Sequence, residues 1–466
     1  MVRGTLGVGL IVAVAVLLSA CSAAPVPDVP APPGLPAAQY RFPPAPPAPQ
    51  LPVDPAVDMA LRDITDTLAA GSVNGDALDT VAASGDSRMV WLVSDLLRFV
   101  RGGDEEDWLV AAFTRLSGVD PSADPAFHTS PWQSITNHLI AWDLPAPPGY
   151  REYKASVFLQ VEPRWARFFA DADSEIDWRL VSWGGVLIDD RPLGDREPCE
   201  SGCIPALDDP ALTDAAGGSW YPDDRIVFGV VVDGAAVAFP RNIMEIHEMV
   251  NTTIGGRRLG IPYCTLCGSA QAYLTEQVPP GVEVPVLRTS GLLSRSNKVM
   301  YDLRTGSVLD TFTGAALSGP LQDAGVTLPQ VSVVASTWGA WKQAHPDTMV
   351  VAEGAGLGRD YPLDPLRGRD DNGPIFPVGP VDPRLPVQAK VLGVLTADGA
   401  PVAFDAAAAR LAIGQDGPVT AAGVEVFADG GGLRARVPGG AELAAHEAFW
   451  FAWSQFHPDT ALWPPP

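Results

Sequence analysis

The sequence has few basic residues, few cysteines and few histidines for a chain of 466 residues. It holds 31 lysines and arginines against 55 aspartates and glutamates, which gives a formal net charge of -24. This excess of negative charge disfavours nucleic acid and anionic membrane surfaces as partners, because both repel an acidic protein. A hydrophobic content of 47% is typical of globular proteins, and the length suffices for two or three domains.

Several catalytic motifs are also absent from the sequence. It contains no G-x-S-x-G, Walker A, H-E-x-x-H or dinucleotide-binding pattern. His247 and Glu248 begin like a zinc-protease motif, but Asn251 stands where the second histidine would be. No stretch after the first 20 residues is long and apolar enough to span a bilayer. The sequence leaves open whether the protein is an enzyme, and it specifies no protein or small-molecule partner.

Residues 1–20 are typical of a secretory signal peptide. An uncharged apolar run follows Arg3, and the ending Leu-Ser-Ala-Cys is similar to a bacterial lipobox. We therefore predict that Cys21 is acylated and anchors the protein in the lipid bilayer, on the extracytoplasmic side of the cell membrane. Residues 22–55 are rich in proline and alanine, a composition that favours an extended tether over a packed core.

Two different patterns follow the tether. Residues 56–182 carry apolar side chains at helical spacing, beginning with Val57, Leu61 and Ile64. We predict an all-helical accessory domain there, with short antiparallel helices similar to HEAT repeats. From residue 183 onward glycines, turns and short β-branched runs dominate, so residues 183–461 are predicted to be rich in β-strands. The predicted fold class is α+β.

An internal repeat divides the β-rich part. The element W-x-x-W-x-x-x-H-P-D-T occurs twice with identical spacing, beginning at Trp338 and at Trp450, and a strand–Asp-Gly–strand hairpin precedes each copy. We predict two related units, residues 224–350 and 389–461, joined by a linker at 351–388. Features shared by both units are expected to be architectural, whereas features of one unit are candidates for function.

The first unit alone carries a short segment with two thiols and an imidazole. Cys264 and Cys267 form a C-x-x-C motif that follows His247, and none of the three recurs in the second unit. Two thiolates and an imidazole suit a copper or zinc ion, so these residues are candidate metal ligands. His345 is a further candidate, although His457 repeats it where no cysteines are present.

Other interpretations of these residues remain open. The C-x-x-C pair is alternatively a redox dithiol that exchanges with a partner, or a structural disulfide in a non-catalytic envelope binding or assembly module. Cys199 and Cys203 bring the cysteines after the lipobox to four, and local or crossed disulfides are both compatible with that number. Three polar residues are candidates for lining a pocket or, alternatively, for capping helices and turns: Arg241, Asn251 and Asp302.

A series of ordered motifs resembles the domain of unknown function 3179 family. They are Ile204-Pro-Ala-Leu-Asp, His247-Glu-Met-Val-Asn251, Tyr263-Cys-Thr-Leu-Cys-Gly-Ser, Ser290-Gly-Leu-Leu, Asn297-Lys-Val-Met-Tyr-Asp302 and Thr337-Trp-x-x-Trp…His345-Pro. The resemblance covers about Trp183 to Ala461. It implies a fold and a location in exported or membrane-anchored proteins of bacteria and archaea, and no particular reaction. The sequence departs from the family at Cys199 and Cys203, where the family usually has Asp-Gly, and we expect this extra pair to form a local staple.

Overall fold

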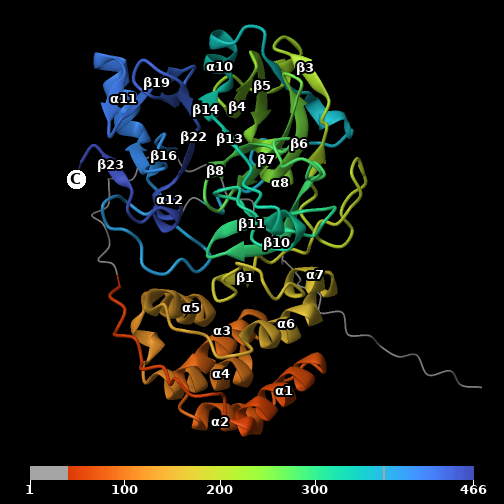
Figure 1. The fold of residues 1–466 in the computed structure, drawn as a ribbon, viewed down its shortest axis with the longest axis vertical. Coiled ribbons are helices and arrows are strands. Elements are labelled where there is room, and N and C mark those ends of the chain that lie inside the picture. Colours follow the sequence, from red (N-terminus) through yellow and green to blue (C-terminus); the bar gives the residue numbers. More distant parts are fainter. Residues whose placement is uncertain (1–39, 371–372, 466) are drawn as a thin grey trace, which may run out of the picture. The chain divides into compact units, whose positions relative to one another are not determined.

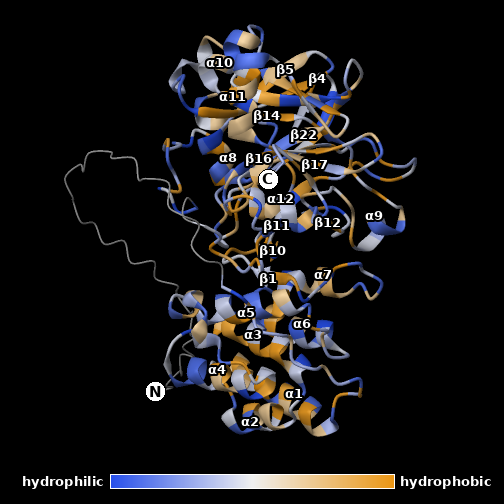
Figure 2. Cartoon of the chain, turned by 90° about the vertical axis from the view of Figure 1, so that its left-hand side faces the viewer, coloured by the Kyte–Doolittle hydropathy of each residue, from blue (hydrophilic) through white to orange (hydrophobic). Residues whose placement is uncertain are grey.

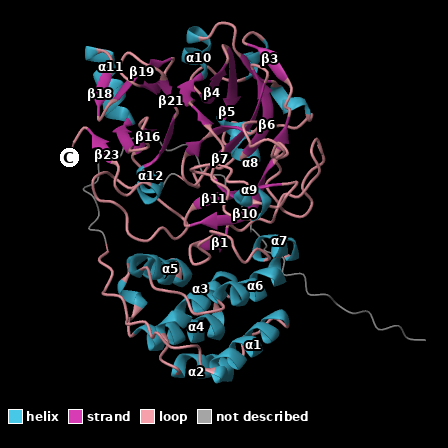
Figure 3. Ribbon diagram, in the orientation of Figure 1, coloured by secondary structure: helices cyan, strands magenta, loops and turns pink. Residues whose placement is uncertain are grey.

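A computed structural model of the protein describes residues 40–370 and 373–465. Helices make up the first part of this region and strands dominate the rest (Figures 1 and 3), which confirms the α+β class. These residues belong to one compact unit that begins at Tyr40. None of their helices combines the length and the apolar character needed to cross a membrane. The predicted signal peptide and Cys21 lie outside the described residues.

The helical part begins with helices whose first turns are capped by polar side chains. Asp54, Asn74 and Ser130 each accept a hydrogen bond from a backbone N–H in the helix that follows. The third helix is buried along almost its whole length, and Figure 2 shows hydrophobic residues concentrated along it. The helices of this part are α1 (Pro55–Ala69), α2 (Gly75–Ala83), α3 (Val90–Phe99), α4 (Gly103–Ser117), α5 (Pro131–Trp142), α6 (Tyr150–Val161) and α7 (Ala166–Phe169).

Residues 40–54 pack against these helices, which differs from the tether expected as far as residue 55. The Tyr40 hydroxyl lies 3.1 Å from His138 Nε2, and the Phe42 ring packs edge-on against the same imidazole. Trp142 Nε1 donates a hydrogen bond to the Pro43 carbonyl at 2.7 Å. Aromatic residues interrupt the proline- and alanine-rich composition here, and they supply the groups that dock on the helices.

The largest hydrophobic core continues from the helices into the first sheet of the β-rich part. It joins Trp91 and Phe158 of the helices to Leu292 and Tyr301 of the sheet. The expected boundary at residue 182 therefore falls inside a shared core, because the first strand lies next to the helices. This sheet has the order β1 (Val181–Trp183), β10 (Leu287–Ser294), β11 (Asn297–Asp302) and β12 (Val308–Asp310).

A second sheet carries the C-x-x-C motif at the end of its central strand. Residues 259–263 have the apolar pattern of a strand, and the strand extends over Arg257–Cys264. Apolar side chains at helical spacing continue from residue 241 to residue 250, but the helix ends at His247, because Glu248 adopts a left-handed backbone conformation. The sheet order is β13 (Gln330–Val331), β9 (Ala272–Leu274), β7 (Arg257–Cys264), β6 (Met249–Ile254) and β2 (Leu207–Asp208), with β8 (Ser269–Ala270) paired to β7.

Two further sheets share one strand order. In each, a hairpin is flanked by an antiparallel strand on one side and a parallel strand on the other. The first sheet is β14 (Val333–Thr337), β4 (Ile226–Val232), β5 (Ala235–Pro240), β15 (Met349–Val351) and β3 (Leu212–Asp214). The other is β22 (Ala445–Phe449), β16 (Lys390–Leu395), β17 (Pro401–Asp405) and β23 (Ala461–Trp463).

Helices occupy matching places in the chain beside these two sheets. A helix follows each hairpin, and a second helix follows each outer antiparallel strand. These helices are α8 (Arg241–His247) and α10 (Trp338–Ala344) in the first unit, and α11 (Ala406–Asp416) and α12 (Trp450–Phe456) in the second. The remaining elements are α9 (Gly319–Asp323) and a small sheet of β18 (Val419–Ala421), β19 (Val424–Asp429), β20 (Gly432–Arg436) and β21 (Glu442–Leu443).

The repeated W-x-x-W-x-x-x-H-P-D-T element makes the same contacts in both units. Trp341 Nε1 donates to Thr348 Oγ1 at 2.9 Å, and Trp453 Nε1 donates to Thr460 Oγ1 at 3.0 Å. The two indole rings press against glycines of the neighbouring strands, where an added Cβ would lie 2.3 Å from the first ring and 2.1 Å from the second. A tryptophan packed on a strand glycine explains why both residue types occur at the same positions in each unit.

Candidate functional site

Cys264 and Cys267 lie in a tight turn between two paired strands. Cys264 is the last residue of β7 and pairs with Ser269 of β8. The Gly268 N–H donates to the Thr265 carbonyl at 3.1 Å, and Gly268 has a positive φ of 57°, which favours glycine. The motif therefore differs from a C-x-x-C at a helix N-terminus, where the helix dipole would act on the thiols.

The two sulfur atoms lie 2.9 Å apart, and both cysteines are free thiols buried in the protein. The S–S bond of a disulfide is about 2.05 Å long, so a small movement of the two sulfurs toward each other would allow the bond to form. Cys267 Sγ lies 3.4 Å from the Ser296 carbonyl oxygen and 3.3 Å from Asn297 Oδ1, both of which accept from a thiol. These contacts hold Cys267 on the side of β11.

A cavity of about 80 Å³ lies next to Cys264. Cys264 contributes to its wall, whereas Cys267 does not. The polar part of the wall consists of Glu248, Thr265, Thr289, Lys298 and Arg369. Most of the remaining wall is apolar and comes from β10, from the segment before Cys199, and from Leu266 and Phe376.

Charged side chains in the cavity wall form a connected network. Lys298 Nζ lies 2.9 Å from Glu248 Oε2 and also donates to the Glu248 carbonyl at 2.5 Å. Thr265 Oγ1 donates to Glu248 Oε1 at 3.3 Å, and Arg369 Nη2 donates to Thr265 Oγ1 at 3.1 Å. The network places an ammonium, a carboxylate and a guanidinium in the wall of the cavity that Cys264 also lines.

The two thiols differ in their tendency to ionise. Burial and the Glu248 carboxylate disfavour the Cys264 thiolate, but the hydrogen bonds from Cys267 and the Lys298 backbone N–H, together with the Lys298 ammonium, outweigh them, so the pKa of Cys264 is lowered. Burial and the adjacent Cys264 raise the pKa of Cys267 well above its ordinary value. The pair thus combines a thiol at the cavity that ionises more easily than an ordinary cysteine with a thiol behind it that favours its protonated form.

His247 is held by other groups. Its Nδ1 lies 2.7 Å from the Pro205 carbonyl, and its Nε2 lies 2.7 Å from the Tyr361 hydroxyl. Because a carbonyl only accepts, Nδ1 carries the proton and Nε2 accepts from the tyrosine. Burial lowers the pKa of His247 to about 4, so the ring is neutral. Both ring nitrogens thus form hydrogen bonds that connect α8 to the segments of Pro205 and Tyr361.

The other candidate residues from the sequence also lie apart from the cysteine pair and its cavity. His345 stacks on Trp341 and contacts Asp429 Oδ1 through Nε2 at 2.8 Å. The three polar pocket candidates make local or buried contacts and do not line the cavity. Arg241 bonds to Glu245, Asn251 bridges Asp208 and the Leu287 backbone, and Asp302 accepts from Val286 and Thr305. Within residues 40–370 and 373–465, no three His, Cys, Asp or Glu side chains are grouped as metal ligands.

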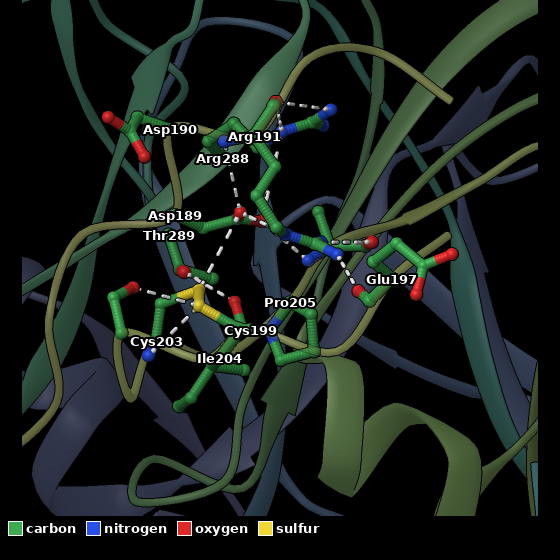
Figure 4. The surroundings of a disulfide bond; sticks show 12 residues. Asp189, Asp190, Arg191, Glu197, Cys199, Cys203, Ile204, Pro205, Arg288 and Thr289 are labelled. Carbon is green, nitrogen blue, oxygen red and sulfur yellow. Dashed lines mark hydrogen bonds and ion pairs between the residues drawn. A yellow bond between two sulfur atoms is a disulfide. The ribbon is translucent and has the colours of Figure 1, made fainter. Parts of the chain in front are cut away.

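Cys199 and Cys203 form a local disulfide (Figure 4), as the sequence led us to expect. The next residue, Ile204, lines the cavity, and its carbonyl accepts a hydrogen bond from Thr289 Oγ1 at 2.8 Å. Cys203 Sγ also lies 3.7 Å from Asp189 Oδ1. The disulfide thus fixes the turn that precedes Ile204 in the cavity wall, next to buried Asp189.

Sequence reasoning identified the thiols but missed the charged groups around them. Lys298 and Glu248 belong to motifs that resemble those of the family, but their spacing in the sequence does not indicate that the two side chains are in contact. Arg369 lies in the predicted linker and is 104 residues from the threonine that it contacts. No local pattern could have found it.

The fold and the site define an α+β protein with a buried cysteine pair at a small charged cavity. The profile of the family described as "Protein of unknown function (DUF3179)" matches residues 201–437, which is just over half of the chain. The protein belongs to this family. Comparison with curated proteins and with solved structures gave no match.

Proposed function

We propose that this protein is a thiol–disulfide exchange protein in which Cys264 is the attacking thiol and Cys267 the resolving thiol. The observation that carries the proposal is the difference between the two sulfurs. Cys264 lines the cavity beside Lys298 and has a lowered pKa, whereas Cys267 lies behind it and has a raised pKa. Exchange needs a thiolate that a substrate can reach and a second thiol within bonding reach.

The proposed reaction proceeds in two displacements. The Cys264 thiolate attacks one sulfur of a substrate disulfide, and the substrate S–S bond breaks to release a first thiolate. Cys267 then loses its proton and attacks Cys264 Sγ, 2.9 Å away, which expels the second substrate thiolate. The substrate gains two electrons and the cysteine pair loses two. A dithiol reductant of the cell envelope returns the pair to its reduced form.

The cavity limits the substrate to a small group. Ligand pockets for drug-sized molecules occupy roughly 300–1,000 Å³, so the cavity of about 80 Å³ admits a small disulfide or the tip of a cysteine-bearing segment. Lys298 is paired with Glu248 and Arg369 with Asp370, so the charges at the wall balance and favour no particular charge on the substrate.

Equilibration of the full-length protein with glutathione redox buffers tests the proposal. We expect Cys264 and Cys267 to lose two free thiols together in one reversible transition, while the Cys199–Cys203 disulfide stays oxidised. Alkylation followed by peptide-resolved mass spectrometry measures both pairs in the same sample. A pair that stays reduced in every buffer, or that oxidises only after unfolding, would sink the proposal and favour a non-catalytic binding or assembly module.

Single-cysteine variants identify which sulfur attacks. Oxidised glutathione should form a stable mixed disulfide with Cys267→Ser, through the remaining Cys264. Cys264→Ser should form much less, because Cys267 does not line the cavity and its burial favours the protonated thiol. Equal trapping by both variants would contradict the assigned order.

Copper(I) or zinc is the second candidate occupant of the same two sulfurs. Soft ions accept thiolate pairs, and Asn297 Oδ1 adds an oxygen 3.3 Å from Cys267 Sγ. Metal analysis of protein purified without a histidine tag decides between the two functions. About one ion per chain that is lost in Cys264→Ser would replace the exchange proposal with a metal-binding one.

The architecture also supports inferences that go beyond the site. We infer that the two sheets of matching strand order arose by duplication of one unit, and that the helical part is a HEAT-like accessory region. We further propose that the protein is attached to the outer face of the cell membrane through acylated Cys21. Metabolic labelling with a fatty acid, compared between the wild type and Cys21→Ala, tests this attachment.

A further inference from the structure

The second unit contacts the thiol turn directly. The Phe449 backbone N–H donates to the Cys267 carbonyl at 2.8 Å, and Lys390 Nζ donates to the Gly268 carbonyl at 2.5 Å. The Lys390 ammonium also lies 4.1 Å from the centre of the Phe449 ring, a distance typical of a cation–π contact. A Cβ on Gly268 would lie 2.2 Å from Lys390 Nζ and 2.8 Å from the Phe449 ring. The side chains of Lys390 and Phe449 therefore pack closely against the cysteine turn.

These two residues distinguish the second unit from the first. Lys390 and Phe449 face each other across β16 and β22. The corresponding pair across β4 and β14 is Ile226 and Thr337, which carries neither a charge nor an aromatic ring. The second unit thus presents a cation and a ring at the position where it meets the cysteines of the first unit. The second unit therefore contributes to the surroundings of the cysteines through side chains that have no counterpart in the first.

We propose that Lys390 and Phe449 form the back wall of the thiol site, in which Lys390 is a positioning residue that holds the turn and prepares Cys267 to resolve the mixed disulfide. This inference rests on the proposed exchange function. In the resolving step the Cys267 proton passes to water, the Cys267–Cys264 S–S bond forms, and the bond from Cys264 to the substrate breaks. The substrate leaves as a thiolate, and the substrate disulfide is the oxidant.

The charge of Lys390 has a defined effect on this step. An ammonium beside a buried thiol stabilises the thiolate, and Lys390 lowers the pKa of Cys267 against the larger effects of burial and Cys264. Burial lowers the pKa of Lys390 to about 8, so it is mostly charged at neutral pH. The other charged or titratable groups that act on the two side chains are Glu447, Arg241 and Arg410 for Lys390, and Cys264 and Glu248 for Cys267.

The two displacements can be timed separately with the chromogenic disulfide 5,5′-dithiobis(2-nitrobenzoate). The first thiolate released reports attack by Cys264, and the second reports resolution by Cys267. In full-length Lys390→Met we expect the first phase to be unchanged and the second to slow about tenfold at neutral pH, where Lys390 is mostly charged. Lys390→Arg should restore most of the second phase, because it keeps the charge.

Lys342→Met is the matched control, because Lys342 pairs with Asp223 at the surface of the first unit. It should leave both phases unchanged. Equal slowing of both phases in Lys390→Met, or a second phase identical to the wild type, would overturn the role of Lys390. If the wild type itself releases no second thiolate, the exchange function fails instead. In that case alkylation of Cys267 in a Cys264→Ser background still tests Lys390, whose replacement by Met should slow the alkylation at neutral pH.

Discussion

The two matching units of the β-rich part use the same frame for different purposes. In both, a tryptophan ring packs on a strand glycine and its indole N–H bonds to a threonine after the His-Pro-Asp sequence. Between the shared hairpin and the shared helix, the first unit inserts β6 to β13 and the cysteine turn. After its own matching helix, the second inserts the small sheet β18 to β21.

This difference separates architecture from chemistry. Contacts present in both units keep the sheets together, and they say nothing about a reaction. The cysteines, Glu248 and Lys298 belong to the first unit, whereas Lys390 and Phe449 belong to the second. The site is therefore built from features that the units do not share, at the place where they meet.

The largest loss of stability is expected when the tryptophan that both units share is replaced. We expect Trp341→Ala and Trp453→Ala each to lower the free energy of unfolding by about 3–5 kcal/mol, because each deletes a fully buried ring. Urea denaturation measures the loss. A loss below about 1 kcal/mol in one variant alone would show that the two units are not equivalent in packing.

Acid should weaken both units through buried neutral histidines. Burial lowers the pKa of His247 in the first unit to about 4 and that of His446 in the second to about 3, against about 6.5 when unfolded. The unfolded chain binds these protons first, so stability is full above pH 6.5 and falls as the pH drops towards 4. Each histidine should account for about 2–3 kcal/mol over this range.

Urea midpoints measured between pH 4 and 7.5 check this expectation. His247→Gln and His446→Gln should each flatten the pH dependence, whatever their effect on stability at pH 7.5. An unchanged slope in either variant would mean that the histidine has the same pKa in the folded and the unfolded protein.

Replacing Lys298 tests the chemistry that the first unit has alone. Lys298→Met removes the ammonium that favours the Cys264 thiolate, so the pKa of Cys264 should rise. Alkylation of Cys264 at neutral pH should slow about threefold, which corresponds to about half a pKa unit, because the hydrogen bonds from Cys267 and from the backbone of residue 298 remain. Because Glu248 loses its partner in this variant, Lys298→Met with Glu248→Gln is the control. An unchanged rate in both variants would exclude Lys298 from activating the thiol.

The smallest expected effect concerns a contact that crosses between the units. His345 of the first unit bonds to Asp429 of the second. Asp429→Asn should lower stability by about 1 kcal/mol and leave the rates of thiol release unchanged. A change in those rates would give the histidine of the repeated element a part in the site, contrary to its packing role.

The sequence predicted more of the fold than of the site. Helical spacing, capping residues and alternating strands are local patterns, so the α+β class, the strand that ends at Cys264 and the helix at Trp338–Ala344 could be predicted. The end of α8 could not, because it depends on Glu248 leaving the helical conformation to meet Lys298. His247 looked like a ligand by its nearness in sequence, yet its partners are Pro205 and Tyr361.

The sequence by itself determined the family, the repeated element and the spacing of the two thiols, because each of these is a pattern along the chain. Only the tertiary structure decided which charges surround the thiols. Arg369 meets Thr265 across 104 residues, and Lys390 meets Gly268 across 122. Such meetings follow from how sheets pack on one another, and that packing is set by buried side chains throughout the protein rather than by any local motif.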